Sequence, residues 1–248
     1  MKSTNIIPLD ILIEKDGIAE YIRDYYSAIT GNLKILYTKD DFYIAEDTTY
    51  QPWISIMGHI PENITEQQLF NMLSGYIEND KYIAVYTNIE KISVMLQKFD
   101  VLTYHEDFLV AIISKIQDID DTGIRLATLD DLPYIESTYS RSRHQQLFNR
   151  ISKKQMWVLE DDKHIKGYAG IHKDYSLGFE YVEPHSRRQN IASRIQLYIA
   201  KRMIENNLIP YIMISVENDI SKRLQTKLES KFSKTIFYFY AKGSYEFE

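Results

Sequence analysis

One order of elements occurs twice along this 248-residue chain, in residues 70–99 and again in residues 199–232. Each stretch reads as a helix that closes on Ile-Glu-Asn, a strand of alternating apolar residues, an asparagine and a second helix. The asparagine is Asn88 in the first stretch and Asn218 in the second. The pattern favours two copies of one α/β unit, with two unrelated strand-helix-strand units as the alternative.

Composition and charge restrict the function of such a chain. Its 29 Lys and Arg against 35 Asp and Glu give a net charge of -6, which argues against nucleic acid as a partner. The absence of cysteine excludes a disulfide framework, thiolate metal sites and a cysteine nucleophile, and it fits a reducing cytoplasm. The first residues lack the uninterrupted apolar core of a signal peptide, and no segment approaches the ~20 apolar residues of a membrane-spanning helix. We therefore expect a cytoplasmic protein without a membrane partner.

The polar, acidic run "SKIQDIDDTG" predicts a domain boundary, with one domain at residues 1–117 and another at residues 122–248. After a short strand in the second domain, Thr128 or Asp130 should cap a helix whose first turn holds Pro133. The elements expected after this helix are a hairpin over 155–161 and 166–172, a strand at 177–183, a helix at 191–206, a strand at 211–216, a helix at 219–230 and a strand at 235–241.

The turn that follows the strand at 177–183 carries the clearest functional signal. The run "YVEPHSRRQNIASRI" enters a helix directly from a strand and contains no glycine. A helix that begins this way presents unpaired backbone N–H groups and the positive end of its dipole, which together bind phosphate. Arg187 and Arg188 add positive charge beside it. Taken alone, this spacing is equally consistent with a solvated surface turn.

The runs "IRLATLDDLPYI", V-x-P-x-x-R-x-x-N-x-A (residues 182–192) and "ENDISKRLQTKL" follow one another in this half of the chain. In that order they resemble the first strand and helix, the acyl-CoA loop and the later N-x-x-A/S-x-x-L-Y-x-K stretch of the GNAT N-acetyltransferase superfamily. The resemblance covers roughly residues 122–240. It implies an α/β fold with a mixed sheet, acetyl-CoA as the acyl donor, and tandem GNAT-like domains of which the first is degenerate.

The resemblance also implies a set of acyl-CoA contacts, residue by residue. The backbone of the strand would pair with the pantetheine arm at Tyr181 and Val182. The residues implied around the pyrophosphate are Arg187, Arg188, Gln189, Asn190, Ile191 and Ala192. The acyl-CoA contacts implied in the later stretch are Asn218 and Ser221.

Three positions depart from the family pattern. Asn190 stands where the family has glycine, and asparagine is the non-glycine residue that best tolerates left-handed backbone angles. Arg188 replaces another frequent glycine and would add a contact to phosphate. Gln225 stands where many members have the tyrosine thought to protonate the departing CoA thiolate, so that role is not carried over to it.

Acyl transfer to an amine needs a base, and Glu180 is the carboxylate nearest the implied reaction centre. Burial would raise its pKa toward the range of a base, whereas the alternative is a glutamate that only lines the substrate side. Tyr168, Tyr175 and Tyr181 are candidate acids among 20 tyrosines. The six histidines show no paired-ligand spacing, so we expect no metal.

The corresponding turn of the first half, "GHIPENI", offers a proline and a glutamate in place of arginines and should not hold pyrophosphate. A degenerate first half before an active second half resembles the glycine N-acyltransferase-like branch, which implies a small-molecule amine acceptor. The expected protein is an N-acyltransferase that moves an acetyl group from acetyl-CoA to a primary amine in a ternary complex. The alternative is a non-catalytic acyl-CoA-binding or protein-interaction module with the same fold, and the oligomeric state is left open.

Overall fold

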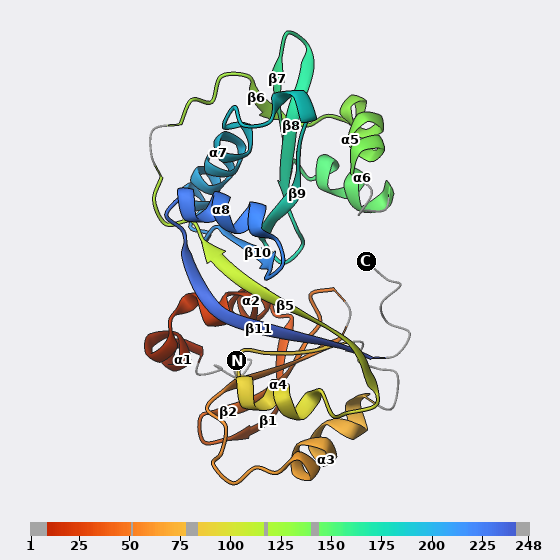
Figure 1. Cartoon of the computed structure of the whole chain (residues 1–248), viewed down its shortest axis with the longest axis vertical. Helices are drawn as coiled ribbons and strands as arrows, with labels where there is room; N and C mark the ends of the chain where they lie inside the picture. Colours follow the sequence, from red (N-terminus) through yellow and green to blue (C-terminus); the bar gives the residue numbers. More distant parts are fainter. Residues whose placement is uncertain (1–8, 51, 78–83, 117–118, 140–143, 242–248) are drawn as a thin grey trace, which may run out of the picture. The chain divides into compact units, whose positions relative to one another are not determined.

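The computed structural model describes residues 9–50, 52–77, 84–116, 119–139 and 144–241 (Figure 1). These residues form two compact units. The first unit holds the residues up to Val110, Ile214–Glu217 and the residues from Phe232 onward, and the second holds Ala111–Met213 and Asn218–Lys231. The boundary expected between residues 117 and 122 falls in part on residues 117–118, which lie outside the described residues.

The first unit contains a helical pair, a mixed sheet and two further helices. In chain order its elements are α1 (Leu9–Asp16), α2 (Ile18–Ile29), β1 (Leu33–Lys39), β2 (Phe42–Asp47), β3 (Trp53–Gly58), α3 (Glu66–Ile77), β4 (Ala84–Thr87), α4 (Glu90–Leu96), β5 (Leu102–Ile112) and β11 (Lys231–Ala241). Its strand order is β1-β2-β3-β4-β11-β5. The pairs β1/β2, β2/β3 and β4/β11 are antiparallel, whereas β3/β4 is parallel.

Strand β3 is buried along nearly its whole length, because helices cover both faces of this sheet. On one face Ile54 and Ile56 pack in a core with Leu69 of α3. On the other face Met57 packs in a core with Leu12 of α1. Burial on both sides explains the near-continuous apolar run "WISIM", which shows little alternation.

The second unit is a mixed sheet with helices on both faces (Figure 1). In chain order its elements are β6 (Ile124–Leu126), α5 (Leu132–Thr138), α6 (His144–Ser152), β7 (Met156–Asp161), β8 (His164–Ile171), β9 (Ser176–Val182), α7 (Ile191–Glu205), β10 (Tyr211–Ser215) and α8 (Asp219–Lys227). The strand order is β6-β7-β8-β9-β10, antiparallel except for the parallel pair β9/β10. Helices α5 and α6 bury Leu132 and Leu147 against Val158 and Tyr168 of the sheet, and α7 lies on the opposite face. Thr128 forms a capping box with Asp131 at the start of the first helical segment, as expected.

The order of elements repeats along the chain, which confirms the predicted tandem architecture. The series α1-α2-β1-β2-β3-α3-β4-α4-β5 corresponds to α5-α6-β7-β8-β9-α7-β10-α8-β11. The first Ile-Glu-Asn run extends into residues 78–83, which lie outside the described residues. β11 ends the second half of the sequence but belongs to the first unit, where Phe237 pairs with Thr87 of β4. The expected second domain, residues 122–248, includes β11, whereas the second compact unit does not include it from Phe232 onward.

Candidate functional site

The turn before α7 has the backbone conformation expected at Asn190. Asn190 precedes the helix with a φ of 62°, in the left-handed region, and Arg188 has a φ of 63°. The first value was expected from the sequence, whereas the second was not, because arginine has no preference for that region. No side chain caps this end of α7. The N–H groups of residues 191–193 have no intrahelical acceptor, so they are donors for an anion.

Helix α3, the counterpart of α7 in the first unit, begins differently. Thr65 Oγ1 accepts a hydrogen bond from the Gln68 N–H at 3.2 Å, and Gln68 Oε1 accepts one from the Thr65 N–H at 2.9 Å. This reciprocal pair is a capping box. The preceding turn is closed on itself as well, since the Ile64 N–H donates to the Pro61 carbonyl. At α3 the N–H of the third helical residue, Gln68, is thus satisfied by the capping side chain, whereas the corresponding N–H of α7 has no side-chain cap.

A pocket of about 330 Å³ opens beside the first turn of α7. Its lining includes Asn190 and Arg194 of the α7 end and Lys227 of α8. Lys227 Nζ donates to Asn190 Oδ1 at 2.6 Å, so α8 places a positive charge at the left-handed residue. Arg194 donates to the backbone oxygens of Asp120 at 2.9 Å and Thr122 at 2.7 Å, and it thereby ties the segment before β6 to α7.

The residues expected around a pyrophosphate lie together in this turn, but their side chains differ in freedom. Arg187 Nε donates to the carbonyl of the last β9 residue at 3.2 Å, and Gln189 Nε2 donates to a carbonyl of the turn at 3.3 Å. Arg188 is exposed. Ile191 is buried and Ala192 half-buried, so these two would contact a ligand through their backbone. The turn therefore offers backbone donors with arginines at its rim.

Asn218 and Ser221, the expected residues of the later stretch, meet at the start of α8. Asn218 Oδ1 accepts a hydrogen bond from the Ser221 N–H at 3.0 Å and so caps the helix. The counterpart Asn88 does not cap α4, because its side chain donates to the Glu20 carbonyl at 3.3 Å. A contact of Asn218 or Ser221 with acyl-CoA stays a prediction.

Strands β9 and β10 are paired only at their beginnings. Their parallel ladder joins residues 211–212 to residues 176–177, and no pair continues toward Val182. The matching strands β3 and β4 stay paired over residues 53–56 and 84–87. The later part of β9 therefore has an edge that β10 does not pair, with which an extended chain of amide groups could pair. This is the edge on which Tyr181 and Val182 were expected to hold pantetheine.

A β-bulge interrupts the pairing of β9 with β8. Two residues of β9, Phe179 and Glu180, stand opposite Ala169 of β8. Phe179 has a φ of 52°, a region that non-glycine residues rarely adopt and that stores backbone strain. The extra residue leaves backbone groups out of the ladder. Nothing in the sequence marked this bulge, because phenylalanine has no preference for such a conformation.

The side chain of Glu180 points into a line of buried polar groups. Gln196 Nε2 of α7 donates to Glu180 Oε2. Gln225 Nε2 of α8 donates to Gln196 Oε1 at 2.7 Å, and Ser230 Oγ donates to Gln225 Oε1 at 2.8 Å. Gln196 is 1% exposed and Gln225 0%. Burial raises the pKa of Glu180, and the hydrogen bond from Gln196 opposes that rise.

Gln196 and Ser230 were not singled out from the sequence. Gln196 lies between Ile195 and Ile199 on the buried face of α7, where apolar residues repeat at helical spacing. A polar residue at such a position was the available signal, because buried amides need partners. Gln225 was noted only as a departure from the family pattern.

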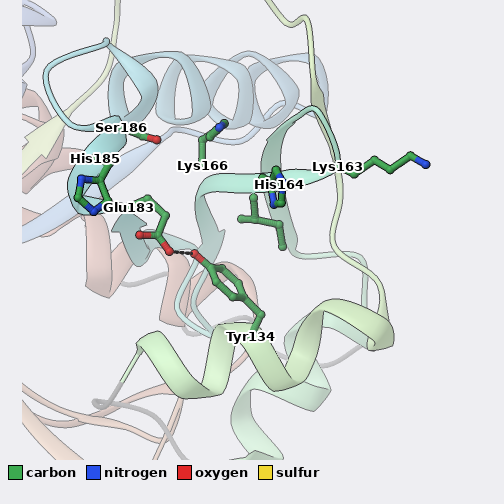
Figure 2. A pocket seen from close by; sticks show the side chains of 8 residues that line it. Tyr134, Lys163, His164, Lys166, Glu183, His185 and Ser186 are labelled. Atoms are coloured by element: carbon green, nitrogen blue, oxygen red, sulfur yellow. Dashed lines mark hydrogen bonds between the residues drawn. The ribbon is translucent and has the colours of Figure 1, made fainter.

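A second pocket, of about 450 Å³, contains the other carboxylate of this region, Glu183 (Figure 2). The Tyr134 hydroxyl of α5 donates to Glu183 Oε1, and Figure 2 shows the two side chains pointing toward each other. Burial and this hydrogen bond raise the pKa of Tyr134. Lys166 and His185 also line the pocket, whereas the side chain of Lys163 extends away from Tyr134 and Glu183. Each carboxylate accepts one side-chain hydrogen bond, and burial raises the pKa of Glu180, which makes Glu180 the better candidate for a base.

The three tyrosines considered as acids occupy different environments. Tyr168 is fully buried, and its hydroxyl makes hydrogen bonds with Thr138 Oγ1 at 2.8 Å and with the Ile135 carbonyl at 3.3 Å. Burial raises its pKa, and its hydroxyl is hydrogen-bonded within the core, which fits a packing role. The Tyr181 ring stacks on Tyr168 with 5.3 Å between centroids, and Tyr175 lies in the turn between β8 and β9. Roles for Tyr175 and Tyr181 stay predictions.

In the described part of the chain, no three His, Asp or Glu side chains are grouped so as to hold a metal ion. Within the same residues, no helix is both long and apolar enough to cross a bilayer. The features that do lie close together along the chain are the open turn before α7, the free edge of β9 and the Glu180 carboxylate.

Residues 116–234 match the family model of the acetyltransferase (GNAT) domain. A comparison with curated protein sequences finds no match. Among solved structures, the chain is similar to a Drosophila protein, with a TM-score of 0.65, 10% identity and coverage of 96% of this chain and 97% of that one. It is also similar to a GCN5-related N-acetyltransferase from Kribbella flavida, with a TM-score of 0.57, 9% identity and coverage of 91% of this chain and 96% of that one. A third similar structure is a putative GNAT-family acetyltransferase from Novosphingobium aromaticivorans, with a TM-score of 0.52, 13% identity and coverage of 89% of this chain and 95% of that one.

Such low identities show a common fold. The matched segment includes the α7 turn, the free edge of β9 and Glu180, in the order expected from the sequence. Residues 116–234 are thus a domain of the GNAT acetyltransferase family, in a chain whose two halves repeat one order of elements.

Proposed function

We propose that the chain is an N-acyltransferase that moves an acetyl group from acetyl-CoA to the primary amine of a small molecule. The observation that carries this proposal is the separation of β9 from β10 next to the uncapped end of α7. Together these features offer a backbone edge for pantetheine and an anion site for pyrophosphate. Arg188 and Lys227 add positive charge around the turn. The GNAT domain supports acyl transfer. The small amine acceptor is proposed only from the sequence resemblance to the glycine N-acyltransferase-like branch.

In this mechanism Glu180 accepts the proton that the amine loses as its nitrogen attacks the thioester carbonyl. Burial raises the pKa of Glu180 and so brings the carboxylate closer to the range in which a base works near neutral pH. A backbone N–H of the bulge at Phe179 and Glu180 polarises the carbonyl oxygen.

The C–N bond then forms and the C–S bond breaks, with CoA leaving as its thiolate. A thiol has a pKa near 8.5, so its departure needs no strong acid. Gln225 cannot act as that acid, since its amide is fully buried and engaged with Gln196. Because the chain has no cysteine, the acetyl group passes directly to the amine without an enzyme thioester.

The test is release of CoA thiol from acetyl-CoA in the presence of amino acids, polyamines and aminoglycosides. We expect saturable, amine-dependent thiol release with at least one class and a product heavier than the amine by one acetyl group. Ala192→Asp, which places an acid among the donors of the α7 turn, should show neither. Tight CoA binding with no amine-dependent release would favour the alternative, a non-catalytic acyl-CoA-binding module. Failure to bind CoA at all would contradict both.

A further inference from the structure

Two fully buried glutamines connect the Glu180 carboxylate to Ser230 after the end of α8. The line runs from Ser230 to Gln225, from Gln225 to Gln196 and from Gln196 to Glu180. It thus joins two helices to the strand that carries the candidate base. Buried polar groups of this kind fix a single arrangement when each member is satisfied, and none of these side chains is among the described buried groups without a partner.

The line has one direction. In the structure Gln196 presents its NH₂ group to Glu180 and its oxygen to Gln225, which is the arrangement that an ionised carboxylate, an acceptor only, requires. Gln225 must then donate through its own NH₂ group and present its oxygen to the Ser230 hydroxyl. Each donor therefore points toward Glu180, and each dipole favours negative charge on that carboxylate.

Charged groups contribute little around Glu180. Among the described residues none is a cause of the shift in its pKa, which burial raises and Gln196 lowers. The neighbours of Gln196 one turn away on α7 are uncharged, and Lys222 on α8 is paired with an aspartate of the same helix. Tyr168 of β8 is hydrogen-bonded to α5, and burial lowers the pKa of His172 in the turn before β9, which favours its neutral form. The amide line is therefore the main polar influence on Glu180.

We propose that Gln196 and Gln225 are positioning residues that hold Glu180 in its ionised form with Oε2 occupied, so that Oε1 receives the proton of the amine. No other described residue donates to this carboxylate. The inference rests on the proposed function and gives Gln225 a role that differs from that of the family tyrosine. Gln225 acts through Gln196 on the base, and it does not contact the leaving thiolate.

The test is a direct titration of Glu180 in the ligand-free protein. Its carboxyl carbon is followed by ¹³C NMR after glutamate labelling and is assigned by its loss in Glu180→Gln. Gln196→Met removes the donor at similar volume, and Glu180 should then titrate about one pH unit higher, the size expected for loss of one hydrogen bond to an ionised group. Ser230→Ala should give a smaller shift in the same direction, because it removes the donor at the far end of the line.

Gln145→Met is the matched control, since Gln145 is an exposed glutamine of α6 whose amide donates a hydrogen bond to Asn149 Oδ1. It should leave the titration of Glu180 unchanged. In the thiol-release assay, the acidic limb of the pH–rate profile of Gln196→Met should be displaced to higher pH. The displacement should equal the change in the Glu180 titration. Because the titration uses no substrate, it decides this inference even where no amine is acetylated.

An unchanged Glu180 titration in Gln196→Met, or an equal shift in Gln145→Met, would overturn the inference. If Gln196→Met does not fold, the Ser230→Ala titration decides in its place, and an unchanged value counts against the proposal. A displaced rate profile without a displaced titration would also overturn it, since the glutamines would then act on another group.

Discussion

The open first turn of α7 can be tested by placing an acid in it. Ala192 is the second residue of the helix, after Asn190 at the cap. Ala192→Asp puts a carboxylate among the N–H donors that we assign to pyrophosphate. In the ligand-free protein an acid here is favourable by about 0.3–1 kcal/mol, because it lies at the positive end of the helix dipole, so the variant should fold. With acetyl-CoA present, the same carboxylate repels the pyrophosphate and occupies its donors.

The expected size of the effect follows from the linkage between binding and folding. A ligand that binds only the folded state adds about 2.7 kcal/mol to the unfolding free energy at 100 times its Kd. For a chain of this length each kcal/mol raises Tm by roughly 2–4 °C, so the wild type should gain about 5–11 °C. Ala192→Asp should lose most of this gain.

The assay is thermal unfolding followed by circular dichroism, with and without saturating acetyl-CoA. Gln67→Asp is the matched control, because Gln67 is the exposed second residue of α3, whose end is capped by Thr65 and Gln68. This variant should keep the full ligand-dependent rise in Tm. Equal rises in the wild type and Ala192→Asp would refute the assignment of the α7 turn, and loss of the rise in Gln67→Asp would assign binding to the first unit.

Three further predictions concern Glu180 and Asn190. Glu180→Gln should lower kcat by about 10²-fold or more with little change in acetyl-CoA affinity, measured by steady-state kinetics and calorimetry; an unchanged rate at every pH would remove it as the base. The same variant should unfold at a higher temperature than the wild type at about pH 8. The reason is that burial raises the folded-state pKa of Glu180, so stability falls as pH rises from the ordinary glutamate pKa of about 4.3 through the folded value. This advantage should vanish below about pH 4, where both states carry the protonated acid, and a difference independent of pH would contradict the cause. Asn190→Val should lose about 1–2 kcal/mol of unfolding free energy, because a φ of 62° strains a β-branched residue, whereas Asn190→Gly should be tolerated. Equal urea midpoints for these two variants would count against that account.

Features that depend on neighbouring residues could be predicted from the sequence. Thr128 caps the first helical segment of the second unit because its hydroxyl and the Asp131 carboxylate reach backbone groups only three residues apart. Asn190 adopts the left-handed region because its short polar side chain tolerates it. The hairpin of β7 and β8 follows from two apolar runs around an acidic turn. In each case the cause lies within a few residues of the effect.

Features that depend on distant partners could not be predicted. Gln196 and Gln225 are 29 residues apart, and either glutamine alone is equally compatible with a solvated helix face. The bulge at Phe179 arises from the register of β9 against β8, which no local residue announces. The apolar run of β11 fits many sheets, so its place beside β4 of the first unit depends on cross-strand packing that the sequence does not reveal.

Calorimetric titration of the full chain with acetyl-CoA tests the central claim most directly. The open turn of α7 and the free edge of β9 have no counterpart in the capped α3 turn and the continuous β3/β4 pairing. We therefore predict one binding site per chain, lost in Ala192→Asp and retained in Gln67→Asp. Two sites per chain, no binding, or normal binding by Ala192→Asp would contradict the assignment of acyl-CoA to the second unit.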